Sequence, residues 1–225
     1  MKILLIEDDE SLASAIREYL KSEDILVEVA QNFQKGQEKA MLYEYDCILL
    51  DLTLPGGDGM EILKTINNSP VKNNVIIISA RGALEDKITG LESGADDFLP
   101  KPFHLAELNA RIKAVVRRKL GSNSNEISIG EIRIDLNNRK VFIGQQEIQL
   151  FRKEFDLLYY FAINKNRLLT KSAIAEYVWG DHYEDADNLD FVYYQIKNLR
   201  KKLLEMNAPF QIASSYGIGY IFKDL

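Results

Sequence analysis

The chain has 225 residues, more than the about 100 to 200 residues of one domain, so two small domains or one large domain are expected. Its composition, 46% hydrophobic and 28% charged, is that of an ordinary globular protein and excludes a disordered or collagen-like chain. The formal net charge of -6 argues against a chain that coats nucleic acid through overall basicity.

The charge is unevenly distributed along the chain. Residues 1–120 carry 15 basic and 20 acidic residues, whereas residues 121–225 carry 13 and 14. The acidity therefore belongs mostly to the first half. In the second half, residues 193–204 hold four basic residues and no acidic one, so a local basic face remains within an acidic protein.

No membrane segment or leader is predicted. The longest apolar runs, such as CILL and VIII, are strand-sized and far below the ~18 residues of a membrane span. Met1 leads directly into the charged run KILLIEDDE, and the single Cys47 cannot form an internal disulfide. We therefore expect a cytoplasmic protein in a reducing compartment, without a membrane partner.

The first half alternates short apolar runs with helical patterns. The runs predict five strands: ILLI (3–6), ILVEV (25–29), CILL (47–50), VIII (75–78) and DDFL (96–99). Between them, apolar residues recur at helical spacing, for example near residues 12–20 and 105–115. This alternation predicts an α/β fold with a doubly wound parallel sheet covered on both faces, and such sheets place their chemistry at the carboxyl ends of the strands.

Polar side chains follow four of these strands: Glu7 to Asp9, then Asp51, then Ser79, and finally Lys101 before Pro102. Crowded carboxylates repel one another unless a cation intervenes, and ligation by oxygen suits Mg²⁺. A metal ion and a lysine together would balance a phosphoryl group. Alternatively, the acids following the first strand are caps of the next helix, but four coinciding strand ends favour a site.

The segments KILLIEDDE, CILLDLTLPGGDGMEIL, VIIISAR and GADDFLPKPF resemble the receiver domain of two-component response regulators, across residues 1–118. The resemblance implies a flavodoxin-like fold and a sensor histidine kinase that phosphorylates Asp51. It also implies the surrounding site: Mg²⁺ held by Glu7, Asp8, Asp51 and the backbone carbonyl of Thr53; phosphoryl oxygens held by Ser79 and Lys101; and Phe98 as the aromatic that turns inward when Ser79 moves.

The alternative to this interpretation is an enzyme. Phosphatases of the haloacid dehalogenase type need a second Asp two residues after the nucleophile, and that position is Thr53. No G-x-G-x-x-G opens a helix after the first strand, which disfavours a dinucleotide enzyme. The chain is therefore not expected to be an enzyme.

The same resemblance implies a homodimer through the fourth helix, fifth strand and fifth helix of the receiver. The matching charged positions are Lys87, Asp96, Asp97, Glu107 and Arg111. Lys87 with Glu107, and Asp97 with Arg111, are the pairs expected between subunits. The alternative is a set of solvated charges, because exposed pairs are individually worth only about 0 to 1 kcal/mol.

A linker is expected at residues 119–125, within a Ser-, Asn- and Gly-rich stretch, and a different sequence pattern follows it. Alternating apolar and polar residues with turn signals predict a small antiparallel sheet over residues 126–150. Helices are expected at about residues 153–163, where Phe151 precedes the start, and at 171–178, capped by Thr170. A third helix, at about 188–205, precedes a hairpin in IASSYGIGYIF.

The third helix combines a buried stripe with a basic face. Its apolar residues are spaced 3, 4, 3 and 4 apart: Leu189, Val192, Ile196, Leu199 and Leu203. Tyr194, Lys197, Asn198 and Lys201 lie on another face, which can contact phosphates and base edges. The alternative is that the basic last turn only complements the helix dipole.

The segments EFDLL, NKNRLLTKSAI, YVWG, QIKNLRKKL and GIGYIF are similar to the winged-helix effector domain of OmpR/PhoB-type transcription factors, across residues 126–225. The resemblance implies an α+β winged helix-turn-helix that binds double-stranded DNA, with the third helix in the major groove and the hairpin wing at the minor groove. The implied contacts are Tyr194, Lys197, Asn198, Arg200, Lys201 and Tyr216. The acidic stretch 181–190 would lie in the loop that can face RNA polymerase.

Two departures from the family pattern carry consequences. Phe151 stands where Thr is usual, so the capping box with Glu154 lacks one partner. Tyr216 stands where the wing usually has Arg, so minor-groove readout should differ and affinity should depend on dimerisation.

The sequence thus predicts a two-component response regulator that regulates transcription, in which phosphorylation of Asp51 favours receiver dimerisation and DNA binding. One alternative is a phosphorylation-independent DNA-binding regulator whose receiver only dimerises. The other is a receiver that regulates a protein partner through the winged helix as a docking domain.

Overall fold

The computed structural model describes residues 1–69, 73–81, 84–119, 126–180 and 189–225, and the chain divides into two compact units, Met1–Lys119 and Leu120–Leu225. The predicted linker, from residue 120 onward, lies outside the described residues, as do most of the acidic stretch 181–190 and the start expected for the third helix at Asn188. Among the residues so described, no helix is both long and apolar enough to cross a membrane.

The N-terminal unit is a doubly wound α/β domain with the strand order β2-β1-β3-β6-β7, all parallel. Its strands are β1 (Lys2–Ile6), β2 (Leu26–Ala30), β3 (Cys47–Leu50), β4 (Thr53–Leu54), β5 (Gly57–Asp58), β6 (Val75–Ser79) and β7 (Asp97–Pro100). Its helices are α1 (Glu10–Ser22), α2 (Phe33–Leu42), α3 (Gly59–Asn68), α4 (Leu84–Glu92) and α5 (Leu105–Lys119). The predicted five-stranded flavodoxin-like sheet is therefore confirmed.

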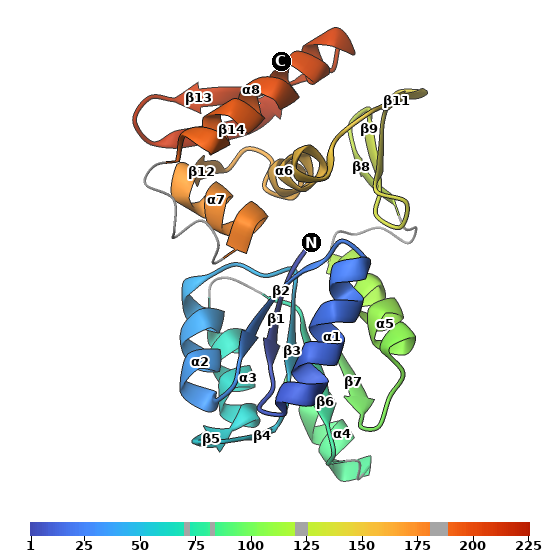
Figure 1. Cartoon of the computed structure of the whole chain (residues 1–225), viewed down its shortest axis with the longest axis vertical. Coiled ribbons are helices and arrows are strands. Elements are labelled where there is room, and N and C mark those ends of the chain that lie inside the picture. Colours follow the sequence, from blue (N-terminus) through green and yellow to red (C-terminus); the bar gives the residue numbers. More distant parts are fainter. Residues whose placement is uncertain (70–72, 82–83, 120–125, 181–188) are drawn as a thin grey trace. The chain divides into compact units, whose positions relative to one another are not determined.

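Burial explains why these strands read as continuous apolar runs. Every residue of β1, β3 and β6 is buried, because α1 and α5 cover one face of the sheet and α2 and α3 the other (Figure 1). Three helices begin at side-chain caps: Asp9 for α1, Asn32 for α2 and Asp58 for α3. The two-residue pair β4 and β5 was not predicted as strands.

A buried group of charges lies in β1 and β2. The side chain of Lys2 has no exposed surface, and its Nζ lies 3.0 Å from Glu28 Oε1. The other oxygen of Glu28 accepts hydrogen bonds from the Tyr45 hydroxyl at 2.7 Å and from Lys39 Nζ at 3.1 Å. Burial alone would raise the pKa of Glu28, but Lys2, Tyr45 and Lys39 outweigh it and hold the pKa below its ordinary value.

The C-terminal unit is a winged helix-turn-helix preceded by a four-stranded antiparallel sheet, as predicted. The strands are β8 (Glu126–Ile129), β9 (Ile132–Asp135), β10 (Lys140–Ile143), β11 (Gln146–Ile148), β12 (Leu168–Thr170), β13 (Phe210–Ser215) and β14 (Gly219–Asp224). The helices are α6 (Arg152–Ile163), α7 (Lys171–Trp179) and α8 (Asp190–Glu205). Sequence patterns missed β12, which pairs with β14 and makes the wing a three-stranded sheet.

Aromatic side chains fill the core of this unit. The rings of Tyr160 and Tyr177 stack with centroids 3.9 Å apart, which joins α6 to α7. Phe222 of β14 stacks on Phe210 at 5.4 Å and contacts Phe161. The predicted cap of α7 is present, since Thr170 Oγ1 accepts the Ala173 N–H at 3.1 Å. The ring contacts join α7 and the two long wing strands to α6.

The start of α6 has the incomplete cap that the sequence predicts. Phe151 is the N-cap residue, and its side chain has no acceptor atom for the backbone N–H groups of the first turn. Only the reciprocal bond is made, from the Phe151 N–H to the Glu154 carboxylate at 2.8 Å. Lys202 Nζ binds the same carboxylate at 2.6 Å and lies 4.6 Å from the centre of the Phe151 ring.

Candidate functional site

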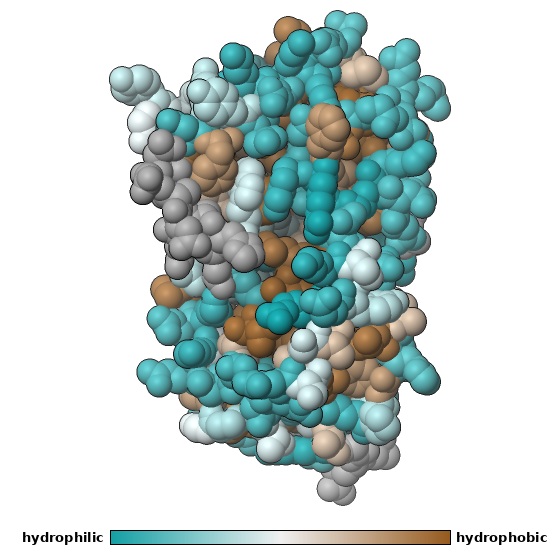
Figure 2. Space-filling model, in the orientation of Figure 1, coloured by the Kyte–Doolittle hydropathy of each residue, from teal (hydrophilic) through white to brown (hydrophobic). Residues whose placement is uncertain are grey.

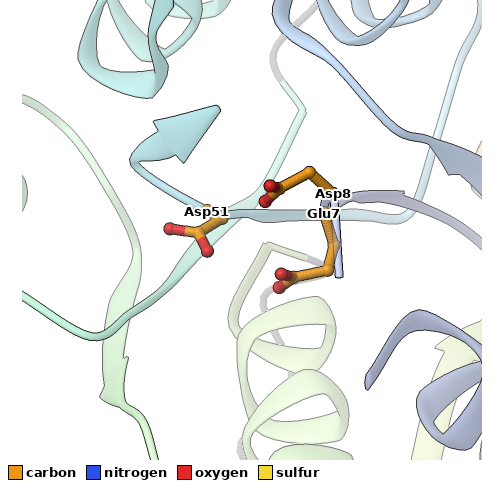
Figure 3. A group of neighbouring side chains, drawn as sticks. All are labelled: Glu7, Asp8 and Asp51. Atoms are coloured by element: carbon orange, nitrogen blue, oxygen red, sulfur yellow. The ribbon is translucent and has the colours of Figure 1, made fainter. Parts of the chain in front are cut away.

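Three carboxylates meet at the carboxyl ends of β1 and β3. Glu7 and Asp8 follow β1, Asp51 follows β3, and one oxygen atom from each lies within 4.8 Å of the others (Figure 3). Glu7 and Asp51 are buried while Asp8 is exposed, so the group opens to solvent on one side. Oxygen ligands at this spacing fit a hard divalent cation with room for water.

Asp9 does not belong to this group. Its carboxylate accepts the N–H groups of Ser11 and Leu12, at 2.9 and 3.1 Å, and so caps α1. The capping explanation for the acidic run is therefore correct for Asp9.

Lys101 follows β7 and is the cation of the site. Its Nζ lies 2.7 Å from Glu7 Oε2 and 2.6 Å from Asp51 Oδ2. The peptide bond to Pro102 is cis, and the Lys101 N–H donates to the Ser79 carbonyl at 2.9 Å. This hydrogen bond joins the segments that follow β6 and β7.

Burial and charge act against each other in this site. Burial raises the pKa of Glu7 above its ordinary value, although Lys101 favours the charged form. For Lys101, burial would lower the pKa, but its hydrogen bonds to Asp51 and Glu7 outweigh burial and raise it. One ammonium group faces three carboxyl groups, so the site can accept further positive charge.

The remaining predicted receiver residues lie at the same edge. The Ser79 side chain is fully buried, and its Oγ accepts the Arg81 N–H at 3.1 Å. The Thr53 N–H donates to Asp51 Oδ1 at 2.9 Å, which places the Thr53 backbone beside the carboxylate group. Phe98 is 2% exposed and belongs to the hydrophobic core, so this structure holds it in an inward position.

Close packing around the loop after β3 was not foreseen from the sequence. A Cβ atom on Gly59 would lie 2.3 Å from the Asp51 carbonyl oxygen, so only glycine lets α3 start against the end of β3. A Cβ on Gly57 would lie 2.5 Å from Phe33, whose N–H donates to the Pro55 carbonyl at 3.1 Å. The glycines signalled a turn, but the role of Phe33 had no sequence signal.

The expected dimer residues lie on α4, on β7 and the residue before it, and on α5. Arg111 forms ion pairs within its own chain, with Asp97 at 2.8 Å and with Glu107 at 2.8 Å. The Asp96 carboxylate accepts the Val75 N–H at 2.8 Å, and Lys87 is exposed. Among the α4 side chains whose burial is described, the exposed apolar ones are Ile88 and Leu91.

Helix α8 presents the predicted polar face. Tyr194, Lys197, Asn198 and Lys201 are exposed, while Val192, Ile196, Leu199 and Leu203 are buried. In Figure 2, the face that carries α8 in Figure 1 is mostly hydrophilic. At the tip of the wing, between β13 and β14, Tyr216 is fully exposed.

Arg200 is one of the expected DNA contacts, but its side chain is directed at the wing. Its guanidinium donates to the Ile212 carbonyl at 2.7 Å and to Ser214 Oγ at 2.8 Å. The sequence offered one signal: Arg200 directly follows Leu199 and so lies beside the buried stripe.

Comparison with known proteins finds a matching family for each of the two units. Residues 3–113 match the family "response regulator receiver domain", and residues 145–222 match "transcriptional regulatory protein, C terminal". The cell cycle response regulator CtrA of Brucella anthropi is 37% identical over 225 residues, which is 100% of this chain and 96% of the relative. CtrA of Brucella abortus is equally similar.

Solved structures give the same picture for the N-terminal unit. The receiver domain of Francisella response regulator 1452 is 34% identical with a TM-score of 0.51, over 52% of this chain and 98% of that one. A two-component response regulator from Clostridium difficile is 31% identical with a TM-score of 0.51, over 55% and 99%.

The chain belongs to the response-regulator family, with a receiver domain joined to a transcriptional output domain. Within the family it is a transcriptional regulator of OmpR/PhoB type, with a receiver followed by a winged-helix DNA-binding domain.

Proposed function

We propose that Asp51 accepts a phosphoryl group from a sensor histidine kinase and that the phosphorylated chain regulates transcription as a dimer. The observation that carries this proposal is the position of Asp51: its carboxylate lies 2.6 Å from Lys101 Nζ and within 4.8 Å of two other carboxylates. This arrangement combines a nucleophile, a fixed cation and a site for a second cation.

Receiver domains generally bind Mg²⁺ at an acidic pocket, and the residues of this chain fit that ion. We assign its ligands as Glu7, Asp8, Asp51 and the backbone carbonyl of Thr53. When bound, Mg²⁺ would neutralise the negative charge on the phosphoryl oxygens and orient the phosphodonor.

The chain's own groups have the following roles in the transfer. An oxygen of Asp51 attacks phosphorus, and the bond from phosphorus to the imidazole nitrogen of the kinase breaks. The imidazole keeps the bond electrons and takes a proton from water, leaving an aspartyl phosphate. Lys101 Nζ, already 2.6 Å from the carboxylate, binds a phosphoryl oxygen.

Ser79 is the residue that senses the product. Its buried Oγ, which now accepts the Arg81 N–H, would turn to donate to a phosphoryl oxygen. That movement releases the backbone after β6 and shifts the packing of Phe98 on β7. The shift changes the neighbouring dimer face on α4, β7 and α5. Phosphorylation then biases an existing equilibrium between monomer and dimer.

The effector unit would bind DNA through α8. Tyr194, Lys197, Asn198 and Lys201 are exposed on one face, which suits phosphates and base edges of the major groove. The wing carries Tyr216 at its tip in place of a charged residue, so its contribution is one of shape. Two effector units on one dimer would compensate for the few basic residues in each.

Comparison of phosphorylated and unphosphorylated protein on DNA tests this proposal. The probe is a duplex that the phosphorylated wild type selects from a random pool. We expect a phosphodonor with Mg²⁺ to tighten binding at least about tenfold, which corresponds to 1.4 kcal/mol, and to convert monomer to dimer in sedimentation. Asp51→Asn should respond in neither measurement.

Two other outcomes would identify the alternatives. If Asp51→Ala binds the duplex as tightly as the phosphorylated wild type, the receiver serves only as a dimerisation module. If the wild type enriches no DNA in any state, the winged helix is a docking domain for a protein.

A further inference from the structure

Arg200 differs from the other basic residues of α8 in where its side chain points. Nε donates to the Ile212 carbonyl at 2.7 Å, and one terminal nitrogen donates to Ser214 Oγ at 2.8 Å. Both acceptors lie on β13, the first strand of the wing hairpin. One guanidinium group therefore joins the helix to the hairpin at two points.

The same guanidinium also contacts the second strand of the wing. Its central carbon lies 5.5 Å from the ring centre of Tyr220, which pairs with Ser214 across the hairpin. Tyr220 is buried, and burial raises the pKa of its phenol despite the nearby Arg200 charge, so the ring stays neutral. Arg200 thus contacts both strands just below the wing tip.

The other two basic residues of the exposed face make no such contact with the part of the chain that the structure describes. Lys201 lies 3.8 Å from Glu205 on its own helix, with its side chain 76% exposed, and Lys197 is also exposed. They remain available to phosphates, whereas the donors of Arg200 are directed at β13.

The wing carries no charged side chain near its tip, and its ion pair lies at the far end of β14, where Asp224 binds Lys165 at 2.8 Å. Residues 211–222, QIASSYGIGYIF, contain no Lys, Arg, Asp, Glu or His. The geometry of the hairpin relative to α8 depends instead on packing and on the two hydrogen bonds of Arg200. A lysine could not replace it, because an ammonium group lacks the planar fork that reaches both acceptors.

We propose that Arg200 is a positioning residue, which holds the wing at a fixed angle to the recognition helix and does not itself contact a DNA phosphate. This inference rests on the proposed DNA-binding function. It gives the uncharged wing a defined place in the complex, so that shape readout at the minor groove does not depend on a wing arginine.

Salt dependence separates positioning from phosphate contact. Each phosphate contact by Lys or Arg contributes about 0.9 to the slope of log affinity against log salt. A displaced wing would leave that slope unchanged, because residues 211–222 carry no charge. The full chain is titrated on the duplex selected by the wild type, over a series of salt concentrations, for Arg200→Ala, Arg200→Lys, Ser214→Ala and the control Lys201→Ala.

We expect Arg200→Ala and Arg200→Lys to weaken binding about tenfold at every salt concentration, with the wild-type slope. Ser214→Ala should weaken binding less, about threefold, again with the wild-type slope. Lys201→Ala should lower the slope by about 0.9.

The inference is overturned if Arg200→Ala lowers the slope as Lys201→Ala does, or if Arg200→Lys binds like the wild type. If Arg200→Ala does not fold, Ser214→Ala decides, since wild-type affinity in that variant would also overturn the inference. A wild type that selects no DNA would remove the proposed function and this role with it, whereas a changed slope removes only the role of Arg200.

Discussion

Lys101 sets the balance of charge in the receiver site. It is the cation that holds two buried carboxylates, Glu7 and Asp51, close together, and its own pKa is raised by both. In the proposed function, the same ammonium group would bind the phosphoryl group. One residue would then stabilise the resting site and contribute to the transfer.

Replacing Lys101 by Ala should slow phosphorylation of Asp51 by about 10- to 100-fold, because charge developing on the phosphoryl oxygens loses a fixed partner. The rate is measured by intact mass over time with a small-molecule phosphodonor and Mg²⁺. Lys21→Ala, an exposed lysine in the last turn of α1, is the matched control. An unchanged rate in Lys101→Ala would exclude this role.

Glu28 provides a pH-dependent contribution to stability. Replacing Glu28 by Gln removes the carboxylate that lies 3.0 Å from the buried Lys2 ammonium, which should cost about 3 kcal/mol at neutral pH. The folded pKa of Glu28 lies below its ordinary value of 4.5, so its contribution is complete above that pH and is lost as the pH falls further.

Urea unfolding followed by circular dichroism measures this difference. The gap between the wild type and Glu28→Gln should be widest near pH 7 and shrink below about pH 4.5. Glu18→Gln, an exposed acid on α1, should show no such gap. A gap that stays constant down to pH 3 would contradict the assignment.

Site residues differed in how far the sequence could predict them. Asp51 and Lys101 were predicted because each follows an apolar strand, and parallel strands bring those ends together. The position of Arg200 depends on a carbonyl and a hydroxyl twelve and fourteen residues further along, at Ile212 and Ser214. The helical pattern alone does not contain that contact.

Among the elements, α6 begins with an uncommon residue. Phe151 occupies the N-cap, and half of a capping box remains in the bond from its N–H to Glu154. A hydroxyl at this position would satisfy a second backbone N–H group of the first turn.

Phe151→Thr should therefore be more stable than Phe151→Ala by about 1 kcal/mol. The comparison with Ala removes the contact between the Phe151 ring and Lys202 from both variants. Trp179, the single tryptophan, lies in α7 of the same unit, so its fluorescence reports this unfolding. Equal stability of the two variants would show that a side-chain cap at this position does not increase the stability of the unit.

Long elements were easier to predict than short ones. The stripe of α8 and the apolar runs of the parallel strands repeat over enough residues to define a period. Strands β4, β5 and β12 have only two or three residues. β4 and β5 pair only with each other, and β12 exists because the distant β14 pairs with it. Turn residues around Gly57 marked a turn and no more.

At the scale of the whole molecule, charge divides the two functions between the units. The acidic N-terminal unit contains the carboxylate group that would hold Mg²⁺ and the phosphoryl group, and it carries the charged face on α4, β7 and α5. The nearly neutral C-terminal unit carries four of its 13 basic residues on α8. Because each effector unit has few basic residues on α8, we expect firm binding to need two effector units on one DNA.

Intact mass after incubation with a phosphodonor and Mg²⁺ tests the central claim, that Asp51 accepts a phosphoryl group, most directly. The wild type should gain the mass of one phosphoryl group, and Asp51→Asn should gain none. An unchanged mass for the wild type, or equal gains in the two proteins, would contradict the account.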